Sequence, residues 1–335
     1  MTIKFTNLAA PIIVNGKTIK NRVVVPPMAD FGMTANDGRV NERHVQHYGA
    51  FASGGAGLII TEACAVSNMN ETRNTIGIFD DSCIPQMSLL AKAAKLNQAV
   101  ALVQLLNSGL SIMPEKTITQ ISREKFLAYK TDFVSAAVRC KKAGFDGIEL
   151  HAAHGFYLNQ IVETSTRTDE YGGSFENRIR IIQELIAGIK AVCGKDFIVA
   201  VRFGNQNIKE LLRTAEAIEN AGGDLLDVST GCTSYHKIPA EISFDSKIYA
   251  ASLVKKAANV PVICVGNITS GKQAEQILEL GFADMTAVGR GHLCDPCWAQ
   301  KAIVGETPNP CINCRTCMWY IDGRKCPSVK RNGEY

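Results

Sequence analysis

The sequence predicts an α/β fold, specifically a (β/α)8 TIM barrel, on three observations. Eight short apolar runs rich in β-branched residues recur along the chain, and helical stretches follow them. Several of those stretches end in a glycine, as at Ala143-Gly144 and Leu280-Gly281, where a helix C-terminus favours a left-handed residue. The turn after the first run, Pro26-Pro27-Met28-Ala29, lacks the G-x-G-x-x-G pattern that a doubly wound dinucleotide-binding sheet would need.

Continuous apolar runs bounded by polar residues or glycine are typical of strands that are buried on both faces of a parallel sheet. In chain order, the predicted strands are residues 21–28, 57–63, 99–105, 147–151, 197–203, 225–229, 261–267 and 283–290. The predicted helices are residues 84–97, 122–143, 175–192, 208–221, 246–258 and 270–280. Ser122 is the expected N-cap of the second helix. Ahead of the barrel, residues 11–20 predict a hairpin around Asn15-Gly16 that covers one end of it.

The chain divides into two parts of different composition. Residues 1–305 carry the predicted barrel, and residues 306–335 form a turn-rich, cysteine-rich extension. The net charge of +4 is small for 335 residues, so nucleic acid is not an expected partner. Neither a signal peptide nor an apolar run of membrane-spanning length is visible, which predicts a cytoplasmic protein whose twelve cysteines are not disulfide-bonded.

The C-terminal ends of the predicted strands are the expected place for an active site, because TIM barrels build their sites there. Two histidines, His151 and His154, stand at the end of the fourth strand. Glycines that follow strands seven and eight would let backbone N–H groups approach a phosphate, and an arginine can bind it with two N–H donors. The predicted phosphate site therefore consists of Gly266, Asn267, Gly289 and Arg290.

Four cysteines of the extension have the spacing of a metal site. The pattern is C-x2-C-x2-C-x8-C-P, formed by Cys311, Cys314, Cys317 and Cys326. Four thiolates at such spacing suit either a tetrahedral zinc ion or a [4Fe–4S] cluster. A second C-x2-C pair, Cys294 and Cys297, is interpreted as mainly structural, with a substitute metal ligand as the alternative.

Residues 151–178, HAAHGFYLNQIVETSTRTDEYGGSFENR, closely resemble the old yellow enzyme family of flavin-dependent oxidoreductases. Asn21-Arg22, residues 144–147 and Val288-Gly-Arg290 extend the similarity over about residues 5–305. The extension, beginning Cys311-Ile-Asn-Cys314, looks like the iron–sulfur branch that includes 2,4-dienoyl-CoA reductase and trimethylamine dehydrogenase. This resemblance implies an FMN-binding barrel, and it favours a [4Fe–4S] cluster over zinc at the four cysteines.

The resemblance also implies roles for individual residues. Gln104 would hydrogen-bond the pyrimidine edge of the flavin, and Arg202 would lie near its N1 and C2 carbonyl. His151 and His154 would hydrogen-bond the carbonyl oxygen of an α,β-unsaturated substrate, so that its β-carbon accepts hydride from flavin N5. The flavin ring would be lined by Pro27, Met28, Ala29 and Ala63. The four residues of the predicted phosphate site would bind the phosphate of FMN.

One position departs from the family pattern. The family's ene reductases usually have a tyrosine two residues after the second histidine, where it gives a proton to the α-carbon, but this chain has Phe156. Tyr157 is the neighbouring candidate for that role, although adjacent side chains generally point apart. The departure leaves open an oxidative reaction of the amine dehydrogenase or demethylase type, and a non-catalytic electron-transfer subunit is the third alternative.

The expected partners follow from the same resemblance. The substrate would be a small molecule, an enone or an enoyl compound. Electrons would come either directly from NAD(P)H or from a separate reductase protein by way of the cluster. The sequence leaves a homo-oligomer open.

Overall fold

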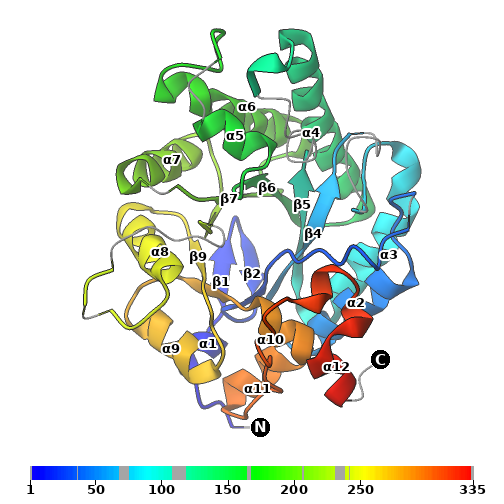
Figure 1. Cartoon of the computed structure of the whole chain (residues 1–335), viewed down its shortest axis with the longest axis vertical. Helices are drawn as coiled ribbons and strands as arrows, with labels where there is room; N and C mark the ends of the chain where they lie inside the picture. The colour runs from blue at the N-terminus through cyan, green and yellow to red at the C-terminus, as the bar shows by residue number, and fades with distance from the viewer. Residues whose placement is uncertain are drawn as a thin grey trace.

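The computed structural model describes residues 2–35, 37–67, 75–107, 118–163, 167–205, 207–230, 238–240 and 242–332. Within them, eight parallel strands close a barrel in the order β10-β3-β4-β5-β6-β7-β8-β9 (Figure 1). The residue range of each strand overlaps one of the predicted runs, so the predicted TIM barrel is confirmed. The strands are β3 (Val23–Val25), β4 (Leu58–Ala65), β5 (Val100–Leu106), β6 (Gly147–Ala152), β7 (Ile198–Phe203), β8 (Leu225–Val228), β9 (Val262–Val265) and β10 (Met285–Ala287).

Helices surround the barrel (Figure 1). The six predicted ones are present as α3 (Ile84–Ala94), α4 (Arg123–Ala143), α6 (Phe175–Cys193), α7 (Ile208–Asn220), α8 (Ser246–Ala257) and α9 (Gly271–Glu279). Ser122 caps α4 as predicted, because its hydroxyl accepts a hydrogen bond from the backbone N–H of Lys125 at 3.2 Å. The helices that the sequence did not predict are α1 (Thr6–Ala9), α2 (Glu42–Ser53), α5 (Tyr157–Glu163), α10 (Gly289–Cys294), α11 (Trp298–Val304) and α12 (Pro327–Asn332).

A β-hairpin closes the N-terminal end of the barrel. It consists of β1 (Ile12–Val14) and β2 (Lys17–Ile19), which pair antiparallel. Asn15 and Gly16 between them both have left-handed backbone conformations, with φ of 47° and 75°, as a two-residue hairpin turn requires. The side chains of Val14 and Ile19 are buried and join the apolar core inside the barrel. The predicted hairpin and its covering position are therefore confirmed.

The core has two parts because strand side chains alternate between the inside of the barrel and its helical coat. Leu102 of β5 and Ala200 of β7 belong to the inner core, whereas Val103 and Val199 pack outward against the helices. Two residues beyond those inner apolar positions, the inward side chains are polar: Gln104 on β5 and Arg202 on β7. The barrel therefore has an apolar, sealed N-terminal end and a polar C-terminal end.

The cysteine-rich extension packs on the outside of the barrel. It contains two 3-10 turns, η5 (Met318–Tyr320) and η6 (Gly323–Lys325), and α12, which lies beside α10 (Figure 1). The side chains of Trp319 and Val329 are buried and belong to the outer core. No helix of the described chain has both the length and the apolarity to cross a membrane.

Candidate active site

Four inward side chains on neighbouring strands form a polar layer near the C-terminal end of the barrel: Gln104, Glu149, Arg202 and Asp227. Gln104 on β5 donates from Nε2 to Oε1 of Glu149 on β6, at 2.8 Å. Nε of Arg202 on β7 lies 3.1 Å from Oδ2 of Asp227 on β8, an ion pair whose angle is not that of a hydrogen bond. Because all four side chains are buried, the layer spans the barrel interior without contact with bulk water.

The layer holds two carboxyl groups and one guanidinium. Burial raises the pKa of Glu149 well above its usual value, and the nearby Asp227 raises it further. Burial also raises the pKa of Asp227, while the positive charge of Arg202 opposes that shift. Because one guanidinium can balance one carboxylate, Glu149 is the neutral acid and Asp227 is the charged partner of Arg202.

The two histidines predicted as substrate ligands lie together at the mouth of the barrel. His151 is the inward residue after Glu149 on β6, and it is paired in register with Arg202. His154 follows the strand with φ of 63°, and this turn brings its ring to a centroid distance of 5.1 Å from the ring of His151. Nε2 of His154 lies 2.8 Å from Oγ of Ser229, which follows β8. The structure therefore joins the predicted pair and adds Ser229 to it.

Both rings are neutral near pH 7. Burial lowers the pKa of His151 well below its usual value, and His154 and Arg202 lower it further. Desolvation and then Arg202 also lower the pKa of His154. Nδ1 of His151 is buried and has no hydrogen-bond partner among the described residues. A neutral imidazole with a free ring nitrogen at the mouth of a barrel is available to a ligand.

Phe156 and Tyr157 point in different directions. The Phe156 ring packs against His151 at a centroid distance of 4.9 Å. Tyr157 begins α5 and turns into the helical layer, where its ring lies 5.3 Å from that of Tyr129 on α4. Its hydroxyl is buried without a hydrogen-bond partner in the described chain, and burial raises its pKa well above the usual value. The prediction that Tyr157 donates a proton beside the histidines finds no support in this position, because its side chain faces away from them.

The residues predicted to line a flavin ring lie on the strands on the other side of the mouth. Pro27, Met28 and Ala29 follow β3, and all three are half-buried. Ala63 on β4 is paired in register with Gln104 on β5, so it lies at the edge of the polar layer. A Cβ atom at Gly289 would lie 3.1 Å from Sδ of Met28, and glycine therefore lets the ends of β3 and β10 approach each other closely.

The structure also brings the predicted phosphate site together. Gly266 has φ of 154°, and a Cβ atom there would lie 3.0 Å from that of Asp245, so the position favours glycine. Asn267 follows with φ of 49°. Nη2 of Arg290 donates to Oδ1 of Asn267 at 3.0 Å, which joins the ends of β9 and β10.

The extension makes contact with the segment that follows β3. The carboxylate of Asp30 accepts hydrogen bonds from the backbone N–H groups of Gly323, at 2.8 Å, and of Gly32, at 2.9 Å. Nη2 of Arg43 lies 3.7 Å from Oδ1 of Asp322. Asp30 is the residue after Ala29, so a single buried carboxylate connects the predicted flavin wall to the extension.

The cysteines of the extension do not form a metal site in this conformation. Cys311, Cys314, Cys317 and Cys326 are half-buried and are not disulfide-bonded. Among the described residues, no group of three or more histidine, cysteine, aspartate or glutamate side chains converges as metal ligands would. The prediction of a metal there thus rests on the cysteine spacing. Cys294 is buried and hydrogen-bonds to Cys311 and Ser328, so it is part of the same cysteine-rich region, whereas Cys297 is exposed.

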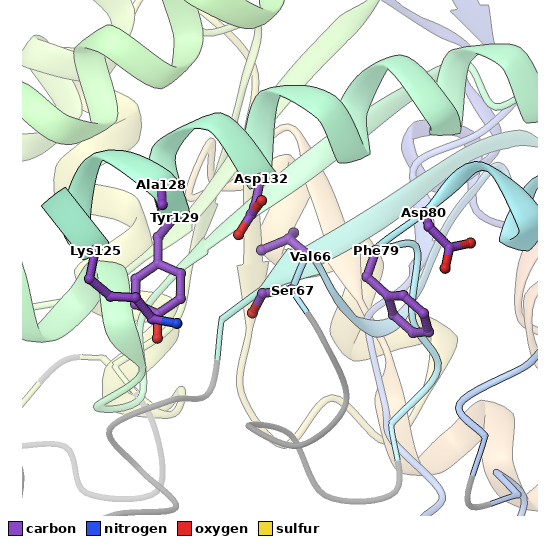
Figure 2. A pocket seen from close by; sticks show the side chains of 8 residues that line it. All are labelled: Val66, Ser67, Phe79, Asp80, Lys125, Ala128, Tyr129 and Asp132. Atoms are coloured by element: carbon purple, nitrogen blue, oxygen red, sulfur yellow. The ribbon is translucent and has the colours of Figure 1, made fainter.

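A separate cavity of about 600 Å³ lies between the segment after β4 and the N-terminal half of α4. Figure 2 shows Lys125 and Tyr129 on one side of it and Phe79 and Asp80 on the other. Neither the histidine pair nor any residue of the polar layer lines this cavity, so it is not the candidate active site.

Sequence reasoning missed two members of the site, Glu149 and Asp227, and it gave no role to Ser229, which stands at a predicted strand end. Glu149 and Asp227 each look like a lone charge inside an apolar run. The signal that finds them is alternation, because each lies two residues before another inward polar residue, His151 and Ser229 respectively.

Comparison with known proteins identifies the family of the chain. Residues 7–125 and 115–308 match the model of a family described as NADH:flavin oxidoreductase / NADH oxidase. An NADH oxidase of Thermoanaerobacter brockii is 35% identical over 353 residues, which cover 92% of this chain and 53% of that protein. An NADPH dehydrogenase of Halalkalibacterium halodurans is 32% identical over 317 residues, which cover 88% of this chain and 93% of that protein.

Solved structures share the fold. A 2-naphthoyl-CoA reductase in complex with 2-naphthoyl-CoA superimposes with a TM-score of 0.85 at 21% identity, over 95% of this chain and 55% of that one. The chain thus spans about half the length of that reductase and of the NADH oxidase, but nearly the full length of the NADPH dehydrogenase.

Proposed function

Because the chain belongs to the NADH:flavin oxidoreductase / NADH oxidase family, a family of flavin-dependent oxidoreductases, we propose that it reduces the activated C=C bond of an α,β-unsaturated carbonyl compound. The observation that carries this proposal is the pair of neutral histidines, His151 and His154, at the open end of the barrel. Bound FMN would supply the hydride, from its N5 to the β-carbon of the substrate.

The residues at the mouth fit the three parts of FMN. Gln104 and Arg202 present hydrogen-bonding and charged groups to a polar ring edge, and the segment after β3 presents a half-buried wall to a flat ring. Arg290 provides a cation for a phosphate. Gly266 and Gly289, which have no side chains, let the backbone approach the phosphate closely. The guanidinium of Arg202 would offer N–H donors to negative charge at the ring edge.

The histidines would hold the substrate oxygen. A neutral imidazole has one N–H to donate, and the free Nδ1 of His151 gives that ring a position for a ligand. A donor aimed at an oxygen that gains negative charge in the transition state contributes about 3 kcal/mol to its stabilisation. The hydrogen bond between Ser229 and His154 holds the second ring in orientation.

The proton for the α-carbon would come from water. Phe156, which packs against His151, has no proton to give, and His154 is assigned to the substrate oxygen. His154 is partly open to solvent at the mouth of the barrel, so water reaches its ring.

The test is anaerobic reoxidation of the FMN-loaded, reduced protein by a panel of cyclic enones, enoyl-CoA thioesters and amines. Enones or enoyl thioesters should reoxidise the flavin, and amines should not. The variant His151→Ala/His154→Ala should retain FMN and lose both this reaction and the charge-transfer band of bound phenols. His154→Asn keeps an N–H donor and is the matched control, with partial loss expected. An unchanged phenol band in the double alanine variant would sink the proposed role of the pair.

The electron supply is a separate question. The names of the relatives, NADH oxidase and NADPH dehydrogenase, support direct reduction by NAD(P)H. The alternative is a separate reductase protein that passes electrons to the flavin through the iron–sulfur cluster. Stopped-flow mixing of the oxidised protein with NADH or NADPH decides between them, because bleaching of the flavin within milliseconds supports the direct route.

The spacing of Cys311, Cys314, Cys317 and Cys326 supports a metal site, and the resemblance to the iron–sulfur branch favours a [4Fe–4S] cluster there, with zinc as the weaker alternative. Since the described side chains do not converge, no electron-transfer step is assigned to such a cluster. Iron and acid-labile sulfide in a 1:1 ratio would support the cluster. One zinc per chain would support the alternative, and protein purified anaerobically with neither metal would reject both.

Phe156 supports a second candidate function. A site without a proton donor beside the substrate is suited to the oxidative direction, in which an amine gives hydride to the flavin and no carbon has to be protonated. Reduction of the oxidised flavin by an amine in the panel, with enones inert, would favour this reading over the first.

A further inference from the structure

Arg290 is held between two asparagines from different parts of the chain. Its Nη2 donates to Oδ1 of Asn267, at the end of β9, over 3.0 Å. Its Nη1 donates to Oδ1 of Asn313, which lies between Cys311 and Cys314 in the extension. One guanidinium therefore connects the predicted phosphate site of the barrel to the cysteine-rich extension.

Both asparagines have left-handed backbone conformations, with φ of 49° at Asn267 and 55° at Asn313. Glycine adopts this conformation without strain, and asparagine is among the few other residues that adopt it readily. Because glycine would serve the backbone at position 313 at least as well, the structural contribution specific to asparagine is its side-chain oxygen. That oxygen accepts from Arg290.

The two acceptors leave the charge of Arg290 uncompensated. An amide oxygen orients a guanidinium without neutralising it, whereas a carboxylate would cancel its charge. Other arginines of the chain pair with carboxylates, such as Arg167 with Asp169 and Arg324 with Asp322. In the described part of the chain, Arg290 has no such ion pair. A guanidinium has five N–H donors, so Arg290 keeps donors for an anion beside its two amide partners.

We infer that Asn313 is a positioning residue for the phosphate of FMN, so that the extension completes the cofactor site of the barrel. This inference rests on the proposed function, because it takes the anion to be the FMN phosphate. Asn313 would act through Arg290, by fixing the guanidinium where the phosphate of a bound flavin lies.

The test compares FMN with riboflavin, which has the same ring and no phosphate. Binding to apoprotein is measured by quenching of flavin fluorescence. Asn313→Gly removes the side chain at a backbone conformation that glycine tolerates, and it should raise the Kd for FMN about tenfold or more, as the loss of one hydrogen bond to a charged group predicts. The Kd for riboflavin should not change. Asn97→Gly is the matched control, because Asn97 is also exposed with φ of 50° but lies between α3 and β5, outside the candidate site.

A double-mutant cycle tests whether Asn313 acts through Arg290. In an Arg290→Ala background, Asn313→Gly should leave the Kd for FMN unchanged, because the group it positions is absent. Tryptophan emission, which comes from the buried Trp298 and Trp319, should be the same in all variants if the extension stays docked. Asn313→Asp should weaken FMN binding at least as much as the glycine variant, because its carboxylate cancels the charge of Arg290.

Three results would overturn the inference: an unchanged Kd for FMN in Asn313→Gly, an equal loss for FMN and riboflavin, or additive losses in the double variant. Failure of the proposed function looks different. In that case the unsubstituted protein would bind FMN no more tightly than riboflavin, and the phosphate site itself would be rejected together with the role of Asn313.

Discussion

Phe156 packs against His151 at the mouth of the barrel, where a phenolic hydroxyl could serve as a general acid. We expect Phe156→Tyr to raise kcat for a cyclic enone by about a hundredfold, because a positioned general acid contributes at least that much when proton transfer limits the rate. Steady-state kinetics at saturating electron donor, with the solvent isotope effect, measures this. Tyr157→Phe is the control and should leave kcat unchanged, since that side chain faces α4. An unaltered kcat in Phe156→Tyr would show that hydride transfer or product release limits turnover.

Glu149 and Asp227 differ in charge although both are buried. Glu149→Gln should change the free energy of unfolding little, because it replaces a neutral acid with a neutral amide of similar shape. Asp227→Asn should destabilise the protein by about 3–5 kcal/mol, because it leaves the buried guanidinium of Arg202 without its counter-charge. Urea denaturation of the two variants measures the difference. Equal destabilisation by both would mean that the two carboxyl groups share the negative charge, and a larger loss in Glu149→Gln would mean that the assignment is reversed.

At the residue scale, the sequence predicts side chains that stand at strand ends, and it does so for a physical reason. Parallel strands bring their C-terminal ends together, so His151, Gln104 and Arg202 could be placed in one site without coordinates. Which way two adjacent side chains point is set by the element that begins there. Because α5 begins at Tyr157, the sequence alone could not separate the direction of Tyr157 from that of Phe156.

At the element scale, the eight strands and the long helices were predictable because each buries a periodic or continuous apolar pattern. The residues at which the elements begin and end were less predictable. The eighth predicted strand, residues 283–290, ends as β10 at Ala287, and α10 begins within the predicted run at Gly289. Short helices such as α10 and α11 have too few turns to present a periodic face. The N-terminus of α2 was hidden because its capping box uses His44 where glutamate or glutamine is usual.

Within α10, His292 gives the stability of this element a pH dependence. The side chain is fully buried, with Nδ1 2.6 Å from the carbonyl oxygen of Val288, and burial lowers its pKa to about 4 from an ordinary value near 6.5. Between those two values the unfolded chain binds a proton and the native chain does not. His292 therefore contributes stability that is present above about pH 6.5 and is lost as the pH falls toward 4, up to roughly 3 kcal/mol.

His292→Gln keeps a donor for Val288 and removes the titrating group. We expect the free energy of unfolding of this variant to fall less steeply than that of the unsubstituted protein between pH 7 and pH 4.5. Chemical denaturation at a series of pH values measures both slopes. Parallel slopes would contradict the assignment of this acid sensitivity to His292.

At the scale of the whole molecule, the extension shares the barrel's core. Trp319 is 2% exposed and lies in the same buried cluster as the helical coat, with its ring stacked on His47 at a centroid distance of 5.2 Å. We expect Trp319→Ala to destabilise the whole protein by about 3–5 kcal/mol and to keep a single cooperative transition. Calorimetry measures both properties, and the exposed neighbour Tyr320→Ala should cause a much smaller change. A separate early transition, with the main one unmoved, would show that residues 306–335 unfold as a domain of their own.

The hairpin that seals the N-terminal end of the barrel has a consequence for the kinetics of the two substrates. The hairpin and the apolar inner core fill that end, so small molecules reach the polar layer from the C-terminal end of the barrel. If NAD(P)H reduces the flavin directly, NAD(P)H and the enone bind to the same site one after the other. This is a ping-pong mechanism, so double-reciprocal plots at several NAD(P)H concentrations are parallel. If a protein delivers the electrons, the enone does not share its binding site with NAD(P)H. Excess NAD(P)H then does not compete with the enone.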